Sequence, residues 1–255
     1  METLRFPQRE ELFRHESSRR TSSIVAETAL IVGAGSGLSA SLARQFAKDG
    51  MRVALAARDT SKLGALVKET AALPIACDAA DSAQVEAMFA AVEAKWGVPD
   101  LVVYNAGYRV RGPLVGLDPK EVERTIRVTG YAGFLVAQSA AKRMLARGSG
   151  AIFFTGASAS VKGYAESAPF AMGKFALRGL AQSMARELAP KGIHVAHFVI
   201  DGGISRGAGD ARAGERGEDG MLMPDEIAKN YLHVFRQHRS AWTWEVELRP
   251  WVERF

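Results

Sequence analysis

Short apolar runs alternate with segments of helical periodicity along most of the chain. Runs of four to eight apolar residues are typical of strands buried on both faces of a parallel sheet. Between them, apolar side chains recur three and four residues apart, as Val85, Met88, Phe89 and Val92 do. The pattern predicts strands at 29–32, 53–56, 73–76, 101–104, 151–154, 193–200 and 244–248, and helices at 38–49, 60–71, 82–96, 119–147 (one long or kinked helix), 169–189 and 224–237.

This alternation of strands and helices predicts an α/β domain over residues 28–255, with a doubly wound, mostly parallel sheet and right-handed crossovers. One interior segment, 202–220, breaks the pattern and is rich in Gly, Arg and Asp. We expect it to be poorly structured, either as an active-site lid or as a disordered insertion. Because it leaves from the carboxyl end of a strand, where ligands bind in such sheets, a lid is compatible with its position.

The first residues differ in character from the rest of the chain. Residues 1–25 are polar, rich in Arg and Ser, and lack the apolar stretch of a secretory signal. Acidic residues also disfavour an organelle transit peptide; they are Glu2, Glu10, Glu11 and Glu16. We therefore expect residues 1–27 to form a flexible N-terminal arm or a short subunit-contact segment.

The composition narrows the class of protein and its compartment. The chain has 255 residues, of which 47% are hydrophobic and 24% charged, as in an ordinary globular protein. A net charge of +5, without a basic block, gives no reason to expect nucleic acid as a partner. No apolar run is long enough for a membrane-spanning helix. The single cysteine, Cys77, excludes an intrachain disulfide and favours a cytoplasmic location.

A glycine-rich turn, residues 33–37, follows the first predicted strand and opens the first predicted helix. Glycines permit a tight turn and let backbone N–H groups approach a pyrophosphate, which the positive end of the helix also attracts. In this context the turn predicts a dinucleotide site, and the alternative is a turn that serves only helix–sheet packing. The predicted cofactor contacts here are Gly33, Gly35, Ser36, Gly37 and Leu38.

The end of the second predicted strand bears on the choice of cofactor. An acidic residue there would bind the ribose hydroxyls and favour NAD, but this chain has Ala57 followed by Arg58. A guanidinium suits a 2′-phosphate, so NADP(H) is predicted over NAD(H). The alternative is that Arg58 is a solvated residue at the entry to a helix.

Further short motifs lie at defined places relative to the predicted strands and helices. They are Gly33-x-x-x-Gly37, Asp78 after the third strand, Asn105-Ala106-Gly107 after the fourth, Lys174 with the run 175–180, and the stretch 185–195. Together they resemble the short-chain dehydrogenase/reductase family over residues 28 to about 250.

The resemblance implies a single-domain Rossmann fold with a seven-stranded sheet and helices on both faces. It implies that Asp78 contacts adenine, that Asn105, Ala106 and Gly107 lie under the cofactor, and that Lys174 holds the ribose. Gly202, from the pair that follows the sixth strand, is a further expected cofactor contact. It also implies a homodimer or homotetramer that pairs through the helices at 119–147 and 169–189.

The chain departs from the family at the positions that carry the chemistry. The general acid/base of the family is a Tyr four residues before the Lys, and here that place holds Phe170. The Ser expected thirteen residues earlier falls on Ala157, with Ser158 next to it, and the expected Asn falls on Thr129. The further departures are Val32 and Ser39 in the glycine motif and Asp201 before Gly202.

Phenylalanine has no titratable group, so Phe170 cannot transfer the proton that the family takes from its Tyr. Lys174 can still hold the ribose, and if it is buried its lowered pKa would let it donate a proton. We select Ser158 and Tyr164 as candidate catalytic hydroxyls because they are close in sequence, against the alternative of ordinary loop residues. Asp201 is either structural or a new acid/base. The other hydroxyls considered are Ser160, Ser167, Tyr104, Tyr108 and Tyr131.

No metal site is expected, because His194 and His197 lie on a predicted buried strand without partners at ligand spacing. Three functional interpretations remain open. The first is an NADP(H)-dependent oxidoreductase with a rebuilt proton relay, acting on a small, moderately apolar carbonyl, alcohol or related unsaturated substrate. The second is a catalytically silent NADP(H)-binding protein that serves as a sensor or structural subunit. A scaffold without nucleotide is a third interpretation, left open by Val32 and Ser39.

Overall fold

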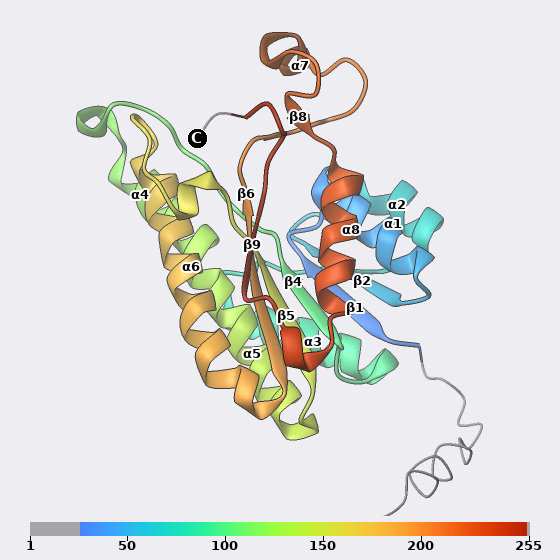
Figure 1. Ribbon diagram of the computed structural model, residues 1–255. Coiled ribbons are helices and arrows are strands. Elements are labelled where there is room, and N and C mark those ends of the chain that lie inside the picture. The colour runs from blue at the N-terminus through green and yellow to red at the C-terminus, as the bar shows by residue number, and fades with distance from the viewer. Residues whose placement is uncertain (1–25, 254–255) are drawn as a thin grey trace, which may run out of the picture.

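Seven strands form one sheet through the middle of the molecule, and every neighbouring pair in it is parallel (Figure 1). The computed structural model describes residues 26–253, so nearly all of the predicted N-terminal arm lies outside the described residues. The strands are β1 (Thr28–Val32), β2 (Arg52–Ala57), β3 (Leu73–Ala76), β4 (Leu101–Tyr104), β5 (Gly150–Thr155), β6 (Ile193–Ile200) and β9 (Glu245–Leu248). The predicted seven-stranded α/β sheet is confirmed.

The strand order, β3-β2-β1-β4-β5-β6-β9, creates a switch point at the centre of the sheet. From β1 the chain first builds outward to β2 and β3, then returns to add β4 on the other side of β1. The loops that leave β1 and β4 therefore diverge at the carboxyl ends of these strands. Ligands of doubly wound folds bind in the crevice that such divergence opens.

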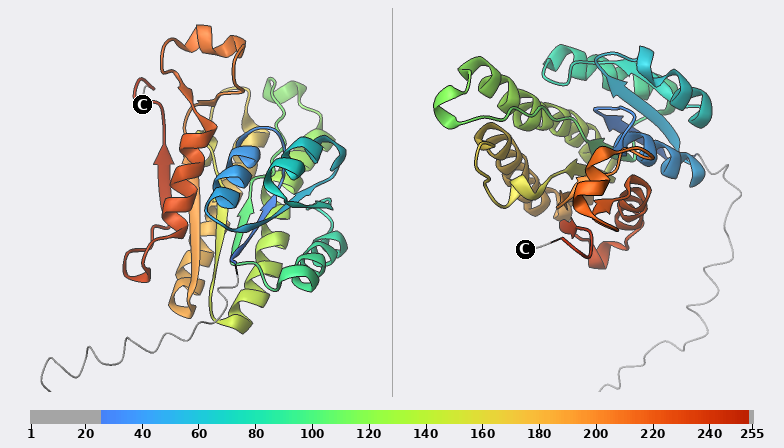
Figure 2. Two further views of the ribbon diagram at one scale, coloured as in Figure 1. Left: turned by 90° about the vertical axis from the view of Figure 1, so that its right-hand side faces the viewer. Right: turned by 90° about the horizontal axis from the view of Figure 1, so that it is seen from above.

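Helices cover both faces of the sheet (Figures 1 and 2). Because side chains alternate along a strand, Leu30 and Val32 of β1 pack on one face while Ala29 and Ile31 pack on the other. Each face is thus apolar, which explains the continuous apolar runs of the sequence. One face carries α3 (Ser82–Trp96), α5 (Ala132–Arg147) and α6 (Ala168–Leu188), and the other carries α1 (Leu38–Lys48), α2 (Gly64–Thr70) and α8 (Pro224–Phe235).

The segment predicted as one long or kinked helix at 119–147 is interrupted. The helix α4 (Pro119–Ile126) runs into a π-helical turn at Arg127–Tyr131, and α5 continues from there. The side chain of Asp118 caps the start of α4 by accepting a hydrogen bond from the Lys120 N–H, 2.9 Å away. The kinked alternative is therefore correct, and the π-helical turn is the kink.

The prediction that 202–220 is poorly structured was wrong. Two-residue strands, β7 (Gly203–Ile204) and β8 (Met221–Leu222), pair with each other, and a short helix, α7 (Ala211–Arg216), lies between them at the top of Figure 1. Asp210 caps α7 through the Arg212 N–H and forms an ion pair with the guanidinium of Arg212. Strands of two residues carry no periodicity that a sequence pattern can show, and this segment is held by polar contacts, both within it and to Glu253.

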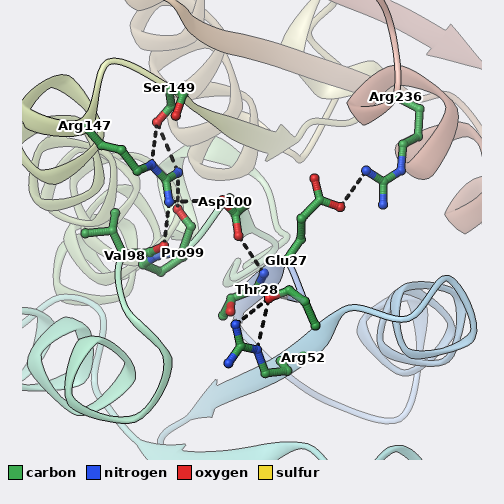
Figure 3. Close-up of polar contacts among 10 residues, drawn as sticks. Glu27, Thr28, Arg52, Val98, Pro99, Asp100, Arg147, Ser149 and Arg236 are labelled. Atoms are coloured by element: carbon green, nitrogen blue, oxygen red, sulfur yellow. Dashed lines mark hydrogen bonds and ion pairs between the residues drawn. The ribbon is translucent and has the colours of Figure 1, made fainter. Parts of the chain in front are cut away.

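At the amino ends of β1 and β4, one arginine links several chain segments through hydrogen bonds and an ion pair (Figure 3). The guanidinium of Arg147 donates to the carbonyl oxygens of Val98, Pro99 and Ser149 and pairs with Asp100 at 3.0 Å. Asp100 in turn accepts the backbone N–H of Thr28 at 2.8 Å. Arg147 thereby fixes the amino ends of β1 and β4, whose carboxyl ends carry the site described next.

Within residues 26–253, no helix combines the length and the apolar character that crossing a membrane requires.

Candidate functional site

The glycine turn after β1 packs directly against the strand end beside it. Gly33 has a φ of +90°, and a Cβ at this position would lie 2.5 Å from the backbone nitrogen of Ala106. Only glycine fits such a close approach. In the described part of the chain, no side chain caps the amino end of α1 at Gly37, and its first turn holds no acidic residue. The N–H groups there keep the partial positive charge that suits an anion.

Ser39, which the sequence marks as a departure from the family's glycine, connects the two loops of the switch point. Its hydroxyl donates to the carbonyl oxygen of Gly33 at 2.9 Å. The side-chain amide of Asn105 donates to the same hydroxyl at 2.7 Å. The serine thus joins the glycine turn to the loop after β4, a role that spacing alone did not reveal.

Two neighbouring pockets meet at Asn105 and Gly107, at the carboxyl end of the sheet. The smaller, of about 370 Å³, brings together the predicted cofactor residues Gly33, Arg58, Asp78, Asn105, Ala106 and Gly107. The larger, of about 670 Å³, is lined by the predicted residues Gly37, Leu38, Asn105, Gly107, Ser158, Tyr164, Lys174, Asp201 and Gly202. Gly35 and Ser36 lie on the turn but line neither pocket.

Lys174 lies on α6 with its side chain buried against the carboxyl end of the sheet. Its Nζ donates to the carbonyl oxygen of Thr155 at 2.7 Å. Burial disfavours the charged ammonium and lowers the pKa of Lys174 to about 8. The ring of Phe170, one helical turn earlier, is centred 5.7 Å from this ammonium. The larger pocket therefore contains an amine that changes charge near neutral pH.

Three of the seven hydroxyls considered from the sequence form hydrogen bonds outside the larger pocket. The phenol of Tyr104 is buried and donates to the Val128 carbonyl, and Tyr108 donates to Glu121 at 2.6 Å. Ser160 accepts the Ala157 N–H at 3.1 Å. Of the hydroxyls considered, Ser158 and Tyr164 line the larger pocket, and Ser160, Ser167, Tyr104, Tyr108 and Tyr131 do not.

Thr129, at the place where the family resemblance puts an Asn, lies in the π-helical turn. Its hydroxyl accepts the backbone N–H of Tyr108 at 3.2 Å and donates to the carbonyl of the same residue at 3.3 Å. The side chain also packs tightly on α6, because a Cβ on Gly173 would come within 2.7 Å of it. Thr129 therefore fixes the loop after β4 against α6 and lines neither pocket.

Asp201, at the end of β6, is buried between two cations. Its carboxylate pairs with Arg249 at 3.0 Å and with Lys162 at 3.6 Å, while its N–H donates to Leu248 at 2.8 Å. These contacts join the end of β6 to the segment after β9. Asp201 lines the larger pocket, but its charge is already compensated there.

The two histidines on β6 have protein partners. His194 stacks on Trp242 with ring centres 4.7 Å apart and has its Nε2 2.9 Å from the Thr243 carbonyl. His197 places Nδ1 3.0 Å from the Glu245 carboxylate. Burial lowers the pKa of His197 to about 4, so its ring is neutral at physiological pH.

Arginines around the larger pocket form the part of the site that the sequence analysis missed. Arg109 and Arg111 come from the loop after β4, and the guanidinium carbon of Arg109 lies 5.0 Å from the centre of the Phe170 ring. The signal was two arginines at alternate positions shortly after Asn105-Ala106-Gly107, which no motif includes.

The glycine turn at an uncapped helix end, the two pockets that meet at the switch point and the buried lysine are the features of an NAD(P)-dependent oxidoreductase of the doubly wound class. The family model described as short chain dehydrogenase matches residues 27–208. The chain belongs to this family, as its resemblance predicted.

Similar proteins support the same assignment. D-threitol dehydrogenase of Mycolicibacterium smegmatis is 30% identical over 174 residues, which cover 66% of this chain and 67% of that protein. The crystal structure of a short-chain dehydrogenase from Rhodopseudomonas palustris has a TM-score of 0.76 at 35% identity, covering 88% of this chain and 99% of the other. A gluconate 5-dehydrogenase from Burkholderia cenocepacia, in complex with NADP and tartrate, has a TM-score of 0.77 at 28% identity and coverages of 88% and 94%.

Proposed function

We propose that this chain uses NADP(H) to interconvert a small, moderately apolar carbonyl compound and its alcohol, without a tyrosine in the proton relay. One observation carries the proposal. The two pockets that meet at Asn105 contain Arg58 in the smaller and Lys174 in the larger, so one extended dinucleotide can contact both. The NADP complex of the related gluconate 5-dehydrogenase supports the choice of cofactor.

The residues present fit the parts of the dinucleotide. The glycine turn and the amino end of α1 offer N–H groups to the pyrophosphate. In the smaller pocket Arg58 suits a 2′-phosphate and Asp78 the adenine, while Lys174 in the larger pocket suits the nicotinamide ribose. When bound, the nicotinamide supplies or accepts the hydride.

Lys174 is the proposed proton donor for the carbonyl oxygen. With a pKa of about 8 its amine is mostly protonated at pH 7 and readily gives up a proton. Ser158, in the same pocket, is the proposed hydrogen-bond donor that polarises the oxygen, and Tyr164 is a second candidate. Asp201, held by Arg249 and Lys162, is proposed to keep the site's geometry while Gly202 gives the cofactor room.

Titration of the full-length protein with NADPH and NADH, followed by nucleotide fluorescence, tests the cofactor assignment. NADPH is expected to bind at least tenfold more tightly than NADH, and Arg58→Gln to remove that difference while leaving NADH binding unchanged. Lys62→Gln, a change to another cation of the same pocket, is the control. Failure to bind either nucleotide, or tighter binding of NADH, would overturn the proposal.

A screen of ketones, aldehydes, enones and imines with NADPH, read at 340 nm, tests the reaction. Turnover is expected with the native chain and its loss with Lys174→Met. A loss of turnover with nucleotide binding retained points to the proton step, whereas a loss of both points to the ribose contact. Binding without any turnover in the native chain would favour the second interpretation.

That second interpretation, a silent NADP(H)-binding protein, also has a structural basis. Phe170 and Ala157 carry no hydroxyl, and the hydroxyl of Thr129 is committed to the backbone of Tyr108. Nucleotide binding without turnover would then regulate or stabilise an assembly. The screen above separates the two interpretations.

We further propose that the chain forms homodimers or homotetramers through α5 and α6. Apolar side chains are exposed on and next to these helices: Tyr131, Phe134, Met172 and Phe175. Light scattering after gel filtration is expected to show an oligomer that Phe175→Asp shifts toward the monomer. The same change at Val115, an exposed apolar residue outside these helices, is the control. The proposed compartment is the cytoplasm, where a free thiol such as that of Cys77 stays reduced.

A further inference from the structure

The larger pocket carries more positive charge than the proposed cofactor contacts use. Its lining includes two carboxylates, those of Asp201 and Glu253. Its cationic lining residues are Arg109, Arg111, Lys174, Arg206, Arg212 and Arg216. Such an excess in a concave site raises the local concentration of anions.

Several of these charges are already compensated within the protein. The guanidinium of Arg212 pairs with Asp210 at 2.6 Å, and that of Arg216 pairs with Glu253 at 3.0 Å. The carboxylate of Asp201, the other acidic lining residue, pairs with Lys162 and Arg249, which do not line the pocket. Over residues 26–253, Arg109, Arg111 and Arg206 have no carboxylate within ion-pair distance. Of these, Arg109 and Arg111 form a pair on the loop after β4.

Arg109 lies close to Lys174, the proposed proton donor. The Arg109 guanidinium lies over the ring of Phe170, 5.0 Å from its centre, while the Lys174 ammonium lies 5.7 Å from the same centre. Partial burial and the nearby charge of Arg111 lower the pKa of Arg109. An anion between the two guanidiniums would relieve their mutual repulsion and replace lost water contacts.

The proposed contacts of the cofactor's phosphates are residues other than Arg109 and Arg111. The glycine turn and the uncapped end of α1 suit the pyrophosphate, and Arg58 lies in the smaller pocket. Arg109 and Arg111 line only the larger pocket, together with Phe170, Ile200 and Ile204. An anionic group at the arginines with a short apolar chain toward Lys174 fits this lining.

We propose that Arg109 and Arg111 bind the carboxylate of the substrate, so that the substrate class is an oxo acid and its hydroxy acid. This inference rests on the proposed function and narrows its substrate. In the reduction, NADPH gives a hydride to the carbonyl carbon and becomes NADP⁺, and the carbonyl oxygen takes a proton from Lys174, which bulk water restores. The carboxylate takes no part in bond changes and is held by charge-assisted hydrogen bonds.

Isothermal titration of the NADP⁺-loaded, full-length protein tests the proposal without relying on turnover. The probes are pyruvate, 3-oxobutanoate, 4-oxopentanoate and 5-oxohexanoate, each compared with its neutral primary amide. At least one acid is expected to bind tenfold or more tightly than its amide, as charge-assisted hydrogen bonds require. The preference is expected to weaken as salt is raised.

Arg109→Gln and Arg111→Gln are expected to reduce the preference for the acid to less than threefold, with NADPH affinity and melting temperature unchanged. Arg186→Gln, on the exposed side of α6, is the matched control and should keep the preference. Equal binding of acids and amides by native protein that binds NADPH would overturn this inference alone. Tighter binding of inorganic phosphate than of any acid would also overturn it, while absent NADPH binding would overturn the proposed function beneath it.

Discussion

The side-chain amide of Asn105 donates a hydrogen bond to the hydroxyl of Ser39, 2.7 Å away. Through the bond that Ser39 makes to the Gly33 carbonyl, the loop after β4 and the turn after β1 are held as one unit. Both loops line the smaller pocket, so its shape depends on a bridge that a glycine at position 39 would lack.

Ser39→Ala is expected to weaken NADPH binding several-fold and to destabilise the fold by ~1 kcal/mol, because the partly buried Gly33 carbonyl and Asn105 amide each lose a hydrogen-bond partner. Fluorescence titration and chemical denaturation measure the two effects. Ser41→Ala, a change to another buried serine of α1 outside the bridge, should alter both quantities less. Equal effects of the two substitutions would contradict the bridging role.

The strands of the sheet were predictable because their burial leaves a pattern in the local sequence. Each strand is buried on both faces, so the strand written as Leu101–Tyr104 is apolar at every position and stands out from the helices around it. The segment 202–220 was not predictable for the opposite reason. Its structure comes from capping by Asp210 and from the contact of Arg216 with Glu253, and the latter joins residues distant in sequence.

The candidate site was also predictable only where its residues could be recognised from local sequence. Gly33, Asp78, Asn105 and Lys174 were recognisable because each stands at a fixed place after a strand or on a helix. Arg109 was missed because its importance depends on lying over Phe170, a residue on α6 about sixty positions later in the chain. Sequence spacing cannot show which loop side chains meet over a pocket.

Arg147→Ala is expected to lower the free energy of unfolding by ~2 kcal/mol, because the carbonyls of Val98, Pro99 and Ser149 and the Asp100 carboxylate lose their donor together. Urea denaturation measures the change. Arg186→Ala, with one hydrogen bond to its own helix, should stay within about 0.5 kcal/mol of the native value. A loss at Arg147 no larger than that of the control would show that the contacts in Figure 3 contribute little.

The lowered pKa of His197 predicts that the protein loses stability in mild acid. An unfolded histidine takes up a proton near its ordinary pKa of 6.5, whereas folded His197 does so at about 4 despite the attraction of Glu245. Between these values the unfolded state binds more protons, so the free energy of unfolding falls as the pH is lowered, by at most ~1.4 kcal/mol per pH unit. Lys174 and Arg178 add to the cost of charging the ring.

Denaturation of the native chain between pH 7 and pH 5 measures this effect, and His197→Asn should reduce the slope. The remaining slope is expected from His194, whose pKa burial also lowers. His233→Asn, a change to an exposed histidine of α8, should leave the slope as it is. If the native slope persists in His197→Asn, another group carries the acid sensitivity.

The lowered pKa of Lys174 predicts how the rate of the reaction depends on pH. Reduction needs the protonated amine and should slow as the pH rises through about 8, while oxidation needs the neutral amine and should accelerate over the same range. Initial rates at saturating nucleotide, measured in both directions from pH 6 to pH 10, test this. Profiles that are flat across pH 8 in both directions would rule out Lys174 as the group that exchanges the proton.

Phe170→Tyr is expected to raise the rate of carbonyl reduction by ~10²-fold, within the range that a positioned acid contributes. The new phenol would extend from a ring that already lies within 6 Å of Arg109 and Lys174. Both cations favour the phenolate, so the phenol's pKa would fall toward neutrality and ease proton transfer. The rate of NADPH consumption by the native chain and the variant measures the gain. Phe175→Tyr, on the exposed face of the same helix, controls for the added hydroxyl. An unchanged rate in Phe170→Tyr would mean that proton transfer at this position does not limit the reaction.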